Sequence, residues 1–203
     1  HLHWWDEEED VYDKEGEKVA RSRLVELLGK HYSQHEEREI IGRVKPETYR
    51  SEFGAEGFVP VANGDLKVTE DGVELHDPTP ERGFRSRSPA DWNPDTAAPI
   101  FQTFLESVVL REVDRKARQE YVGYTLMHWG LPLHKALFLV GPQAAGKSTL
   151  LEVICEMLGK ATHLSPHQLV SERFCAVELE DSWANVAADI SSDLLSNVGR
   201  FKE

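Results

Sequence analysis

Residues 141–149 limit most tightly what this chain can fold into. They read GPQAAGKST and match the pattern G-x-x-x-x-G-K-[ST] at every defined position. An apolar run, KALFLV at 135–140, precedes them, and STLLEVICEMLG at 148–159 carries apolar residues at helical spacing. A strand, a glycine-bearing loop and a helix in this order predict a phosphate-binding loop, with Leu137–Val140 as the central buried strand of a parallel sheet.

The residue types in this loop suit phosphate binding. Gly141 and Gly146 should let the backbone bend so that successive N–H groups, with the helix N-terminus, surround the phosphates of a nucleotide. Lys147 is placed to neutralise the β and γ phosphate oxygens, and the Ser148 hydroxyl can ligate Mg²⁺. The alternative is a structural turn with a surface lysine, which the flanking strand and helix patterns disfavour. The predicted nucleotide-binding residues are Gly141, Pro142, Gln143, Ala144, Ala145, Gly146, Lys147, Ser148 and Thr149.

A carboxylate that holds magnesium should follow on a later strand. The residues SWANVAADISSD at 182–193 lead from an apolar strand candidate into Asp189. We therefore predict that Asp189 and Ser148 hold Mg²⁺, and that Lys147 and Asp189 are the catalytic residues. Asp193 is better explained as a helix-capping or solvated acid.

The residues between these two motifs predict a short helix that separates two strands. Residues 171–174 are expected to cap it. Arg173 could face a neighbouring nucleotide, but an ordinary ion pair or surface position is favoured, because a single charge indicates little.

The first part of the chain alternates between helical and strand patterns. Residues 2–11 predict a strand end and a charged loop, and apolar spacing predicts an amphipathic helix at 17–32 and a second helix at 36–44. The dipeptides Asn63-Gly64 and Asp71-Gly72 lie between short alternating apolar runs. They predict a small antiparallel meander.

A proline-rich connector follows the meander, and helical spacing returns from Pro99 until Gly130 and Pro132. The predicted fold class is an α+β N-terminal domain followed by the first part of an α/β P-loop (AAA+-like) ATPase domain. The predicted boundaries are 1–130 for the N-terminal domain and 131–203 for the truncated ATPase domain.

The composition constrains the compartment and the partners. Neither of the two cysteines lies in a disulfide or zinc pattern, and no apolar run reaches the length of a membrane span, so we expect a cytoplasmic protein that does not enter a membrane. The net charge of -13 argues against a nucleic-acid partner, unless DNA meets only a local basic patch or pore, or the acid excess is an adaptation for solubility, as in high-salt organisms. The chain begins at His1 without Met, and we expect it to be a piece of a longer polypeptide.

Residues 123–159 resemble the start of the helicase domain in phage and plasmid primases, which are members of helicase superfamily 3. They read GYTLMHWGLPLHKALFLVGPQAAGKSTLLEVICEMLG. Residues 58–68 and 91–108 resemble the turn and the connector that precede the motor in those proteins. Residues 164–193 resemble the family's stretch from an Arg-Phe pair to the acid-bearing strand, and Phe201-Lys202 matches a recurrent Phe-Lys pair.

This resemblance implies an ATP-dependent DNA helicase or translocase that serves viral or plasmid replication. It implies ATP and Mg²⁺ as cofactors, with Gly141, Gly146, Lys147 and Ser148 on the nucleotide and Asp189 on the metal. It implies single-stranded or forked DNA as partner, a homo-hexameric ring, and contacts with primase or other replication proteins. The family's sensor residue, arginine finger and pore loop are expected beyond Glu203, so this piece should bind ATP poorly and should not unwind DNA alone.

Two other functions stay open. One is another P-loop ATPase or a kinase, although no arginine-rich lid or acceptor site is evident. The other is a DNA- or partner-binding replication module without activity of its own, in which aromatic and basic residues stack on bases or contact phosphates. Packing is favoured for the aromatic pair and a solvated connector for the arginines. The residues concerned are Trp4, Trp5, Arg82, Phe84, Arg85 and Arg87.

Overall fold

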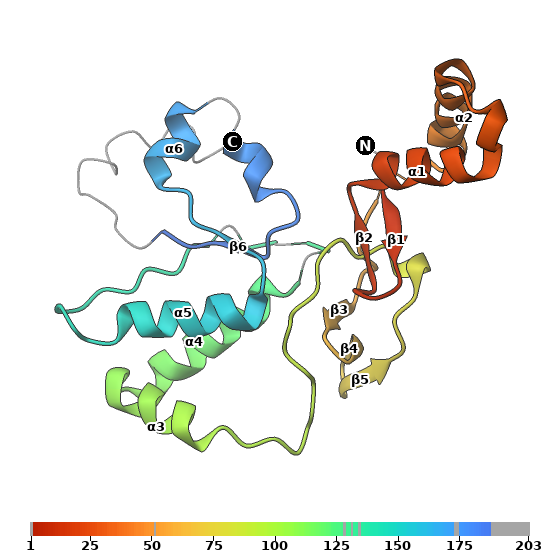
Figure 1. Ribbon diagram of the computed structural model, residues 1–203. Helices are drawn as coiled ribbons and strands as arrows, with labels where there is room; N and C mark the ends of the chain where they lie inside the picture. The colour runs from red at the N-terminus through yellow and green to blue at the C-terminus, as the bar shows by residue number, and fades with distance from the viewer. Residues whose placement is uncertain are drawn as a thin grey trace. The chain divides into compact units, whose positions relative to one another are not determined.

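The computed structural model describes residues 2–50, 52–127, 129–130, 132–133, 135–172 and 175–187. The described residues form a mixed α/β protein with small sheets and six α-helices (Figure 1). The chain divides into two compact units. Unit 1 comprises His1–Ala55 and Pro78–Ser86, and unit 2 comprises Glu56–Asp77 and Arg87–Glu203. The functional boundary predicted at residue 130 stays a prediction.

Unit 1 combines a β-hairpin with a pair of helices. Strand β1 (Trp4–Asp6) pairs antiparallel with β2 (Val11–Asp13). The expected strand end is β1 and the charged loop is the turn of this hairpin, whereas β2 was not predicted. Helix α1 (Gly16–Leu28), the 3-10 turn η1 (Gly29–His31) and α2 (Gln34–Glu47) follow. Both predicted helices are therefore confirmed, and the second is longer than predicted.

Local chemistry explains where α2 begins and how α1 and α2 pair. The Ser33 hydroxyl accepts a hydrogen bond from the Glu36 N–H at 3.2 Å, which caps the start of α2. Arg21 of α1 pairs with Glu37 of α2 at 3.1 Å, and Glu17 pairs with Lys45. The hydrogen bond and charge of Lys45 lower the pKa of Glu17. These cross-helix pairs define the α1–α2 hairpin.

The meander belongs to unit 2. Strands β3 (Phe58–Val61), β4 (Gly64–Thr69) and β5 (Gly72–His76) form an antiparallel sheet in the order β3-β4-β5, as predicted. Each two-residue loop lies one position before the expected dipeptide, because each glycine is already the first paired residue of the next strand. At Gly64, φ is +154° and a Cβ would lie 2.7 Å from the His76 carbonyl oxygen. The close approach of β5 therefore requires glycine there.

The core of unit 2 joins the meander to residues that lie far along the chain. Val59, Val61 and Leu66 form a buried cluster, and the partly buried Leu126, Trp129 and Trp183 pack against it. The predicted N-terminal domain ends at 130, so Trp183 shows that this meander also packs against residues of the predicted ATPase segment. Sequence patterns report the local period of burial but not the identity of the partner.

A buried ion pair holds the first turn of the meander. Asp65 is fully buried, and its carboxylate accepts a hydrogen bond from Arg87 Nη2 at 3.1 Å. Arg87 Nη1 also donates to the carbonyl oxygens of Val61 and Gly64. The part of the connector that belongs to unit 2 therefore starts with a residue bound to the meander, and the expectation of a solvated connector is wrong for Arg87.

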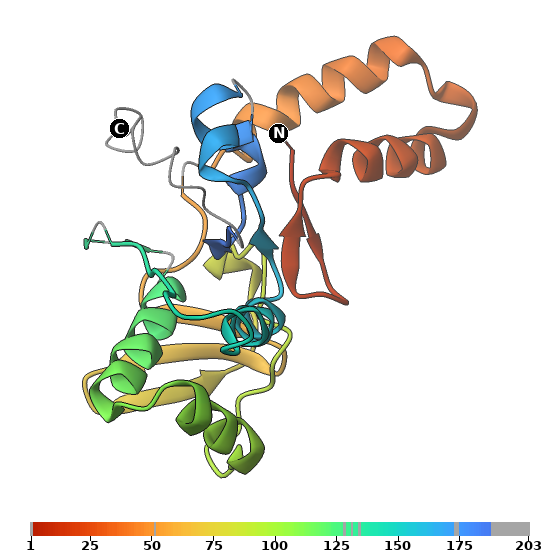
Figure 2. The same ribbon diagram turned by 90° about the vertical axis from the view of Figure 1, so that its left-hand side faces the viewer.

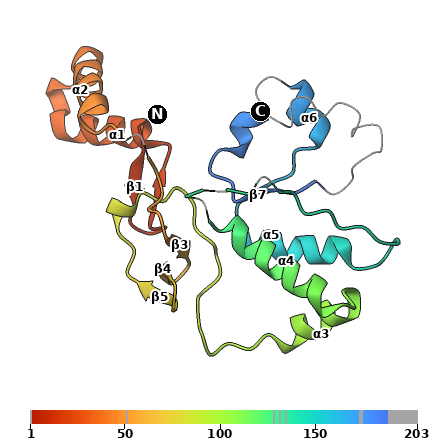
Figure 3. The ribbon, with the colours of Figure 1, turned by 180° about the vertical axis from the view of Figure 1, so that it is seen from behind.

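The second half of unit 2 is mostly helical. Helices α3 (Pro99–Val108), α4 (Glu112–Thr125) and α5 (Lys147–Leu158) lead to β6 (Ala161–Thr162), which pairs in parallel with β7 (Ala184–Asn185). Helix α6 (Pro166–Ser171) and the 3-10 turn η3 (Cys175–Leu179) connect the two strands. The short helix predicted in this segment is confirmed as α6, but the strand that precedes it is β6 and not the predicted strand at 137–140. Figures 2 and 3 show these helices from two further sides.

Two predicted elements differ in the structure. Residues 137–140 are described and form no strand, and the side chains of Phe138 and Val140 are 59% and 91% exposed. The predicted central strand is therefore wrong here, because a strand needs a paired neighbour and the described parallel pair involves only β6 and β7. Helix α4 ends at Thr125 and not near Gly130, since Leu126 and Trp129 leave the helix to pack on the meander.

Candidate nucleotide-binding site

The predicted phosphate loop is a compact turn that runs into a helix. Ala144 and Gly146 have left-handed backbone conformations, with φ of 59° and 75°. Helix α5 begins directly afterwards, and the Leu150 N–H donates to the Gly146 carbonyl at 3.0 Å. The amides of a first helical turn have no acceptor within the helix. Because Ser148 and Thr149 are exposed, this helix end is accessible to an anion.

Lys147 folds back over the loop. Its Nζ atom donates to the carbonyl oxygens of Gly141 at 3.1 Å and Pro142 at 2.7 Å. The two ends of the loop motif, Gly141 and Lys147, are thereby brought together. An ammonium group held by carbonyl oxygens can exchange them for phosphate oxygens, which are stronger, charged acceptors.

The two glycines of the motif differ in their steric environment. A Cβ on Gly146 would lie 2.6 Å from Val108 Cγ1, and its φ is in the left-handed region that favours glycine. A Cβ on Gly141 would meet only Ala145 Cβ, at 3.9 Å. The geometric requirement for glycine therefore lies at Gly146 in this structure.

The far end of α5 is held by the connector. The Ser88 hydroxyl donates to the Met157 carbonyl at 2.5 Å, and a Cβ on Gly159 would lie 2.6 Å from Pro89 Cδ. Leu158 is fully buried. Helix α5 thus has packing contacts where it ends as well as where it begins.

Strand β7 lies in the segment, 182–193, that was predicted to bring a carboxylate to the site. Asp189, Asp193 and Arg173 lie outside the described residues. The described part of the predicted strand is β7, and its flanks also pair in parallel: the Trp183 N–H donates to the Lys160 carbonyl at 2.9 Å, and the Val186 N–H to the Thr162 carbonyl at 2.8 Å.

Asn185 is a residue that the sequence reasoning missed. Its Oδ1 accepts from the Leu164 N–H at 2.8 Å, and its Nδ2 donates to the Leu164 carbonyl at 2.9 Å. Thr162 Oγ1 donates to the same Oδ1 at 3.0 Å. The side-chain amide therefore substitutes for a backbone peptide group and extends the pairing. An asparagine inside an apolar strand pattern, where this residue type is depleted, was the available signal.

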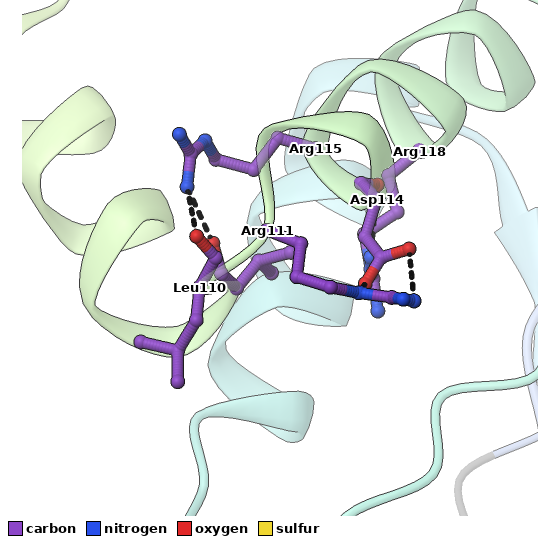
Figure 4. A network of polar contacts seen from close by, with 6 residues as sticks. Leu110, Arg111, Asp114, Arg115 and Arg118 are labelled. Carbon is purple, nitrogen blue, oxygen red and sulfur yellow. Dashed lines mark hydrogen bonds and ion pairs between the residues drawn. The ribbon is translucent and has the colours of Figure 1, made fainter.

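Polar contacts fix the junction between α3 and α4 (Figure 4). Arg115 Nη1 donates to the carbonyl oxygens of Val109 at 2.7 Å and Leu110 at 3.0 Å. Arg111 forms two hydrogen bonds of 2.7 Å with the carboxylate of Asp114, and this neighbour lowers the pKa of Asp114. The arginines drawn there are engaged within the protein, because Arg118 also donates to the Asp114 carbonyl.

The residues suggested for a DNA-binding module have structural partners. Phe84 is only 3% exposed, so the suggested stacking role is wrong for this residue. The Arg85 guanidinium lies over the Phe53 ring, 4.7 Å from its centre, and Trp5 packs edge-on against Tyr12 at 5.3 Å. These contacts favour packing for the aromatic residues, as expected.

Other observations leave the wider expectations open. Within the residues that the structure describes, no group of three or more His, Cys, Asp or Glu side chains could hold a metal ion, and no helix is long and apolar enough to cross a bilayer. The predicted magnesium ligands are one hydroxyl and one carboxylate, so the metal finding does not test them. Comparison with protein-family models and with curated proteins found no match for this chain.

Proposed function

We propose that residues 141–149 bind the triphosphate of ATP with Mg²⁺. The observation that carries this proposal is the Lys147 ammonium folded onto the loop carbonyls beside the exposed N-terminus of α5. Phosphate oxygens would replace Gly141 and Pro142 as partners of Lys147, while first-turn amides donate to them. The Ser148 hydroxyl lies at the same helix end and would ligate Mg²⁺, which neutralises phosphate charge when bound.

We further propose that the parent protein is an ATP-dependent DNA helicase or translocase of replication. The support is the motif resemblance to superfamily 3, together with a loop-and-helix geometry that suits phosphate binding. In this proposal Asp189 is the second magnesium ligand and positions water, and homo-hexameric assembly on single-stranded or forked DNA supplies the remaining groups. Phosphoryl transfer consists mostly of positioning and charge neutralisation, which Lys147 and Asp189 are suited to provide.

Nucleotide binding is tested by titrating a fluorescent ATP analogue with Mg²⁺ into the wild type and into Lys147→Ala. We expect the variant to bind roughly tenfold or more weakly, because it loses a charge-assisted contact worth about 1.5–3 kcal/mol. Lys135→Ala is the matched control, since Lys135 is an exposed lysine upstream of the loop. Equal affinities of wild type and Lys147→Ala would contradict the proposal.

The DNA-translocase proposal is tested with a version extended beyond Glu203. We expect ATP hydrolysis that single-stranded DNA stimulates and that Lys147→Ala abolishes. DNA binding that survives Lys147→Ala, without any stimulated hydrolysis, would favour the binding-module alternative. A salt series separates phosphate contacts from other binding, since phosphate contacts weaken steeply as the salt concentration rises.

A further inference from the structure

Helix α3 packs directly on the phosphate loop. The position of a Cβ on Gly146 lies 2.6 Å from Val108 Cγ1 and 3.4 Å from Phe104 Cε2. Real Cβ atoms do not approach so closely, so the loop backbone has room for a hydrogen only. The side chains of Val108 and Phe104 therefore form a wall against which the loop turns into α5.

Helix α4 holds the chain that enters the loop. The Tyr124 hydroxyl accepts a hydrogen bond from the Leu133 N–H at 2.8 Å and donates to the Leu133 carbonyl at 2.9 Å. The Tyr121 hydroxyl donates to the Lys135 carbonyl at 3.3 Å. Helix α3 therefore contacts the loop itself at Gly146, and α4 contacts the chain before the loop at Leu133 and Lys135.

The position of Gly146 sets the geometry of the start of α5. Its carbonyl accepts the first helical hydrogen bond of α5, from the Leu150 N–H, and the next residue is Lys147. A shift of Gly146 would therefore turn the first-turn amides and move the origin of the Lys147 side chain. Binding groups need to be held close to their productive geometry before the ligand arrives, or affinity is lost.

We infer that Val108 and Phe104 are positioning residues of the nucleotide site, so that α3 is part of this site although it precedes the motif by more than thirty residues. This inference rests on the proposed nucleotide binding. Both side chains are apolar and offer no group to phosphate or metal. Their contribution is to hold Gly146, and through it the start of α5, in the conformation that receives phosphate.

A double-mutant cycle between the loop and α3 tests the inference. Gly146→Ala should weaken binding of the fluorescent ATP analogue roughly tenfold or more. The new methyl group would clash with Val108, and the alanine backbone would have to adopt a left-handed φ, which is unfavourable for residues with a Cβ. Val108→Ala removes the atom that the methyl group would meet. We expect the double variant to bind several-fold more tightly than Gly146→Ala alone, since only the backbone strain then remains.

Two further variants separate positioning from general stability. Val113→Ala alters an exposed valine of α4, so it should not rescue Gly146→Ala. Phe104→Leu should retain most of the affinity, whereas Phe104→Ala should lose it while the far-ultraviolet circular dichroism of the protein stays unchanged. Val113→Ala applies the same change in size as Val108→Ala to a residue off the loop contact, and the two Phe104 variants differ in how much of the contacting side chain remains.

The outcomes distinguish the inference from the function on which it rests. If the wild type binds ATP but Val108→Ala does not rescue Gly146→Ala, the positioning role is overturned and the proposed function stands. If neither this chain nor the version extended beyond Glu203 binds ATP, both are overturned. Rescue by Val108→Ala and not by Val113→Ala supports the inference.

Discussion

Asn185 stabilises a strand pair that is only two residues long in each strand. Its amide makes two hydrogen bonds with the backbone of Leu164 and receives one from Thr162. Leu164 is buried, so the loss of Asn185 would leave its N–H and carbonyl without these partners. An unsatisfied buried group costs about 1–3 kcal/mol.

We therefore expect Asn185→Ala to lower the free energy of unfolding by roughly 2–3 kcal/mol. Urea unfolding, followed by tryptophan fluorescence, measures the change. Asn93→Ala is the control, because the Asn93 side chain accepts one hydrogen bond, from the Asp95 N–H, in an exposed turn, and its loss should cost less than about 1 kcal/mol. Equal losses for the two variants would show that the Leu164 contacts contribute little.

Cys155 provides a second observation at the scale of one residue. Burial in α5, and then the negative charges of Glu156 and Glu152, raise the pKa of its thiol. The thiolate is the reactive form, so a raised pKa reduces reactivity near neutral pH. We expect Cys155 to be alkylated by iodoacetamide several-fold more slowly than a free cysteine in an unstructured peptide, as measured by mass spectrometry.

The two glutamates allow a control for this reactivity. Glu152→Gln with Glu156→Gln removes the charges and should speed the alkylation of Cys155, while the buried Cys175 stays slow. Alkylation at the rate of the free peptide in the wild type would contradict the protected environment.

Helix α4 has an ion pair at its N-terminus that makes its stability depend on pH. Asp114 lies in the first turn and binds Arg111, so its pKa is lower in the folded protein than its ordinary value of 3.8. A lowered folded pKa contributes stability that is complete above the ordinary value and is lost as the pH falls through the folded value.

We expect Asp114→Asn to melt at a lower temperature than the wild type at about pH 6, and this difference to shrink towards about pH 3. Both residues meet solvent, so the difference should also shrink as salt is added. Thermal unfolding at several pH values measures it, with Glu120→Gln on the same helix as the control. A difference that does not change with pH would show that the ion pair is not its cause.

At the scale of the molecule, each compact unit has its own packing. In unit 2, the cluster of Val59, Val61 and Leu66 packs against Leu126 and Trp129 after α4 and against Trp183 before β7. Unit 1 is held by its β-hairpin and by the ion pairs between α1 and α2. A cavity at Leu66 should therefore act on the contacts of unit 2.

We expect Leu66→Ala to destabilise unit 2 by about 2–5 kcal/mol, because a buried side chain leaves a cavity. Hydrogen exchange read by mass spectrometry should then show faster exchange in β3, β4 and α4, with little change in α1 and α2. Leu27→Ala, which alters an exposed leucine of α1, is the matched control and should leave both units unchanged. Equal acceleration across α1 and β4 would show that the units unfold together.

Much of the local structure followed from short-range patterns, and the errors have a common cause. The turn dipeptides and alternating residues predicted the meander, and the helical spacing predicted α1, α3 and α5. The loop-to-helix transition at Lys147 was also predicted. The strand expected at 137–140 failed because apolarity alone does not supply a paired neighbour. The end of α4 was misplaced because tertiary contacts of Leu126 and Trp129 override helical spacing.

The sequence by itself determined the small repertoire of elements and the motif at 141–149, because turn chemistry, periodicity and glycine placement act over a few residues. Only the tertiary structure showed that the meander packs against Trp183, that Arg87 forms an ion pair with Asp65, and that Val108 packs against Gly146. These contacts join residues far apart in the chain. Their energy comes from burial and close packing between surfaces, which no local pattern records.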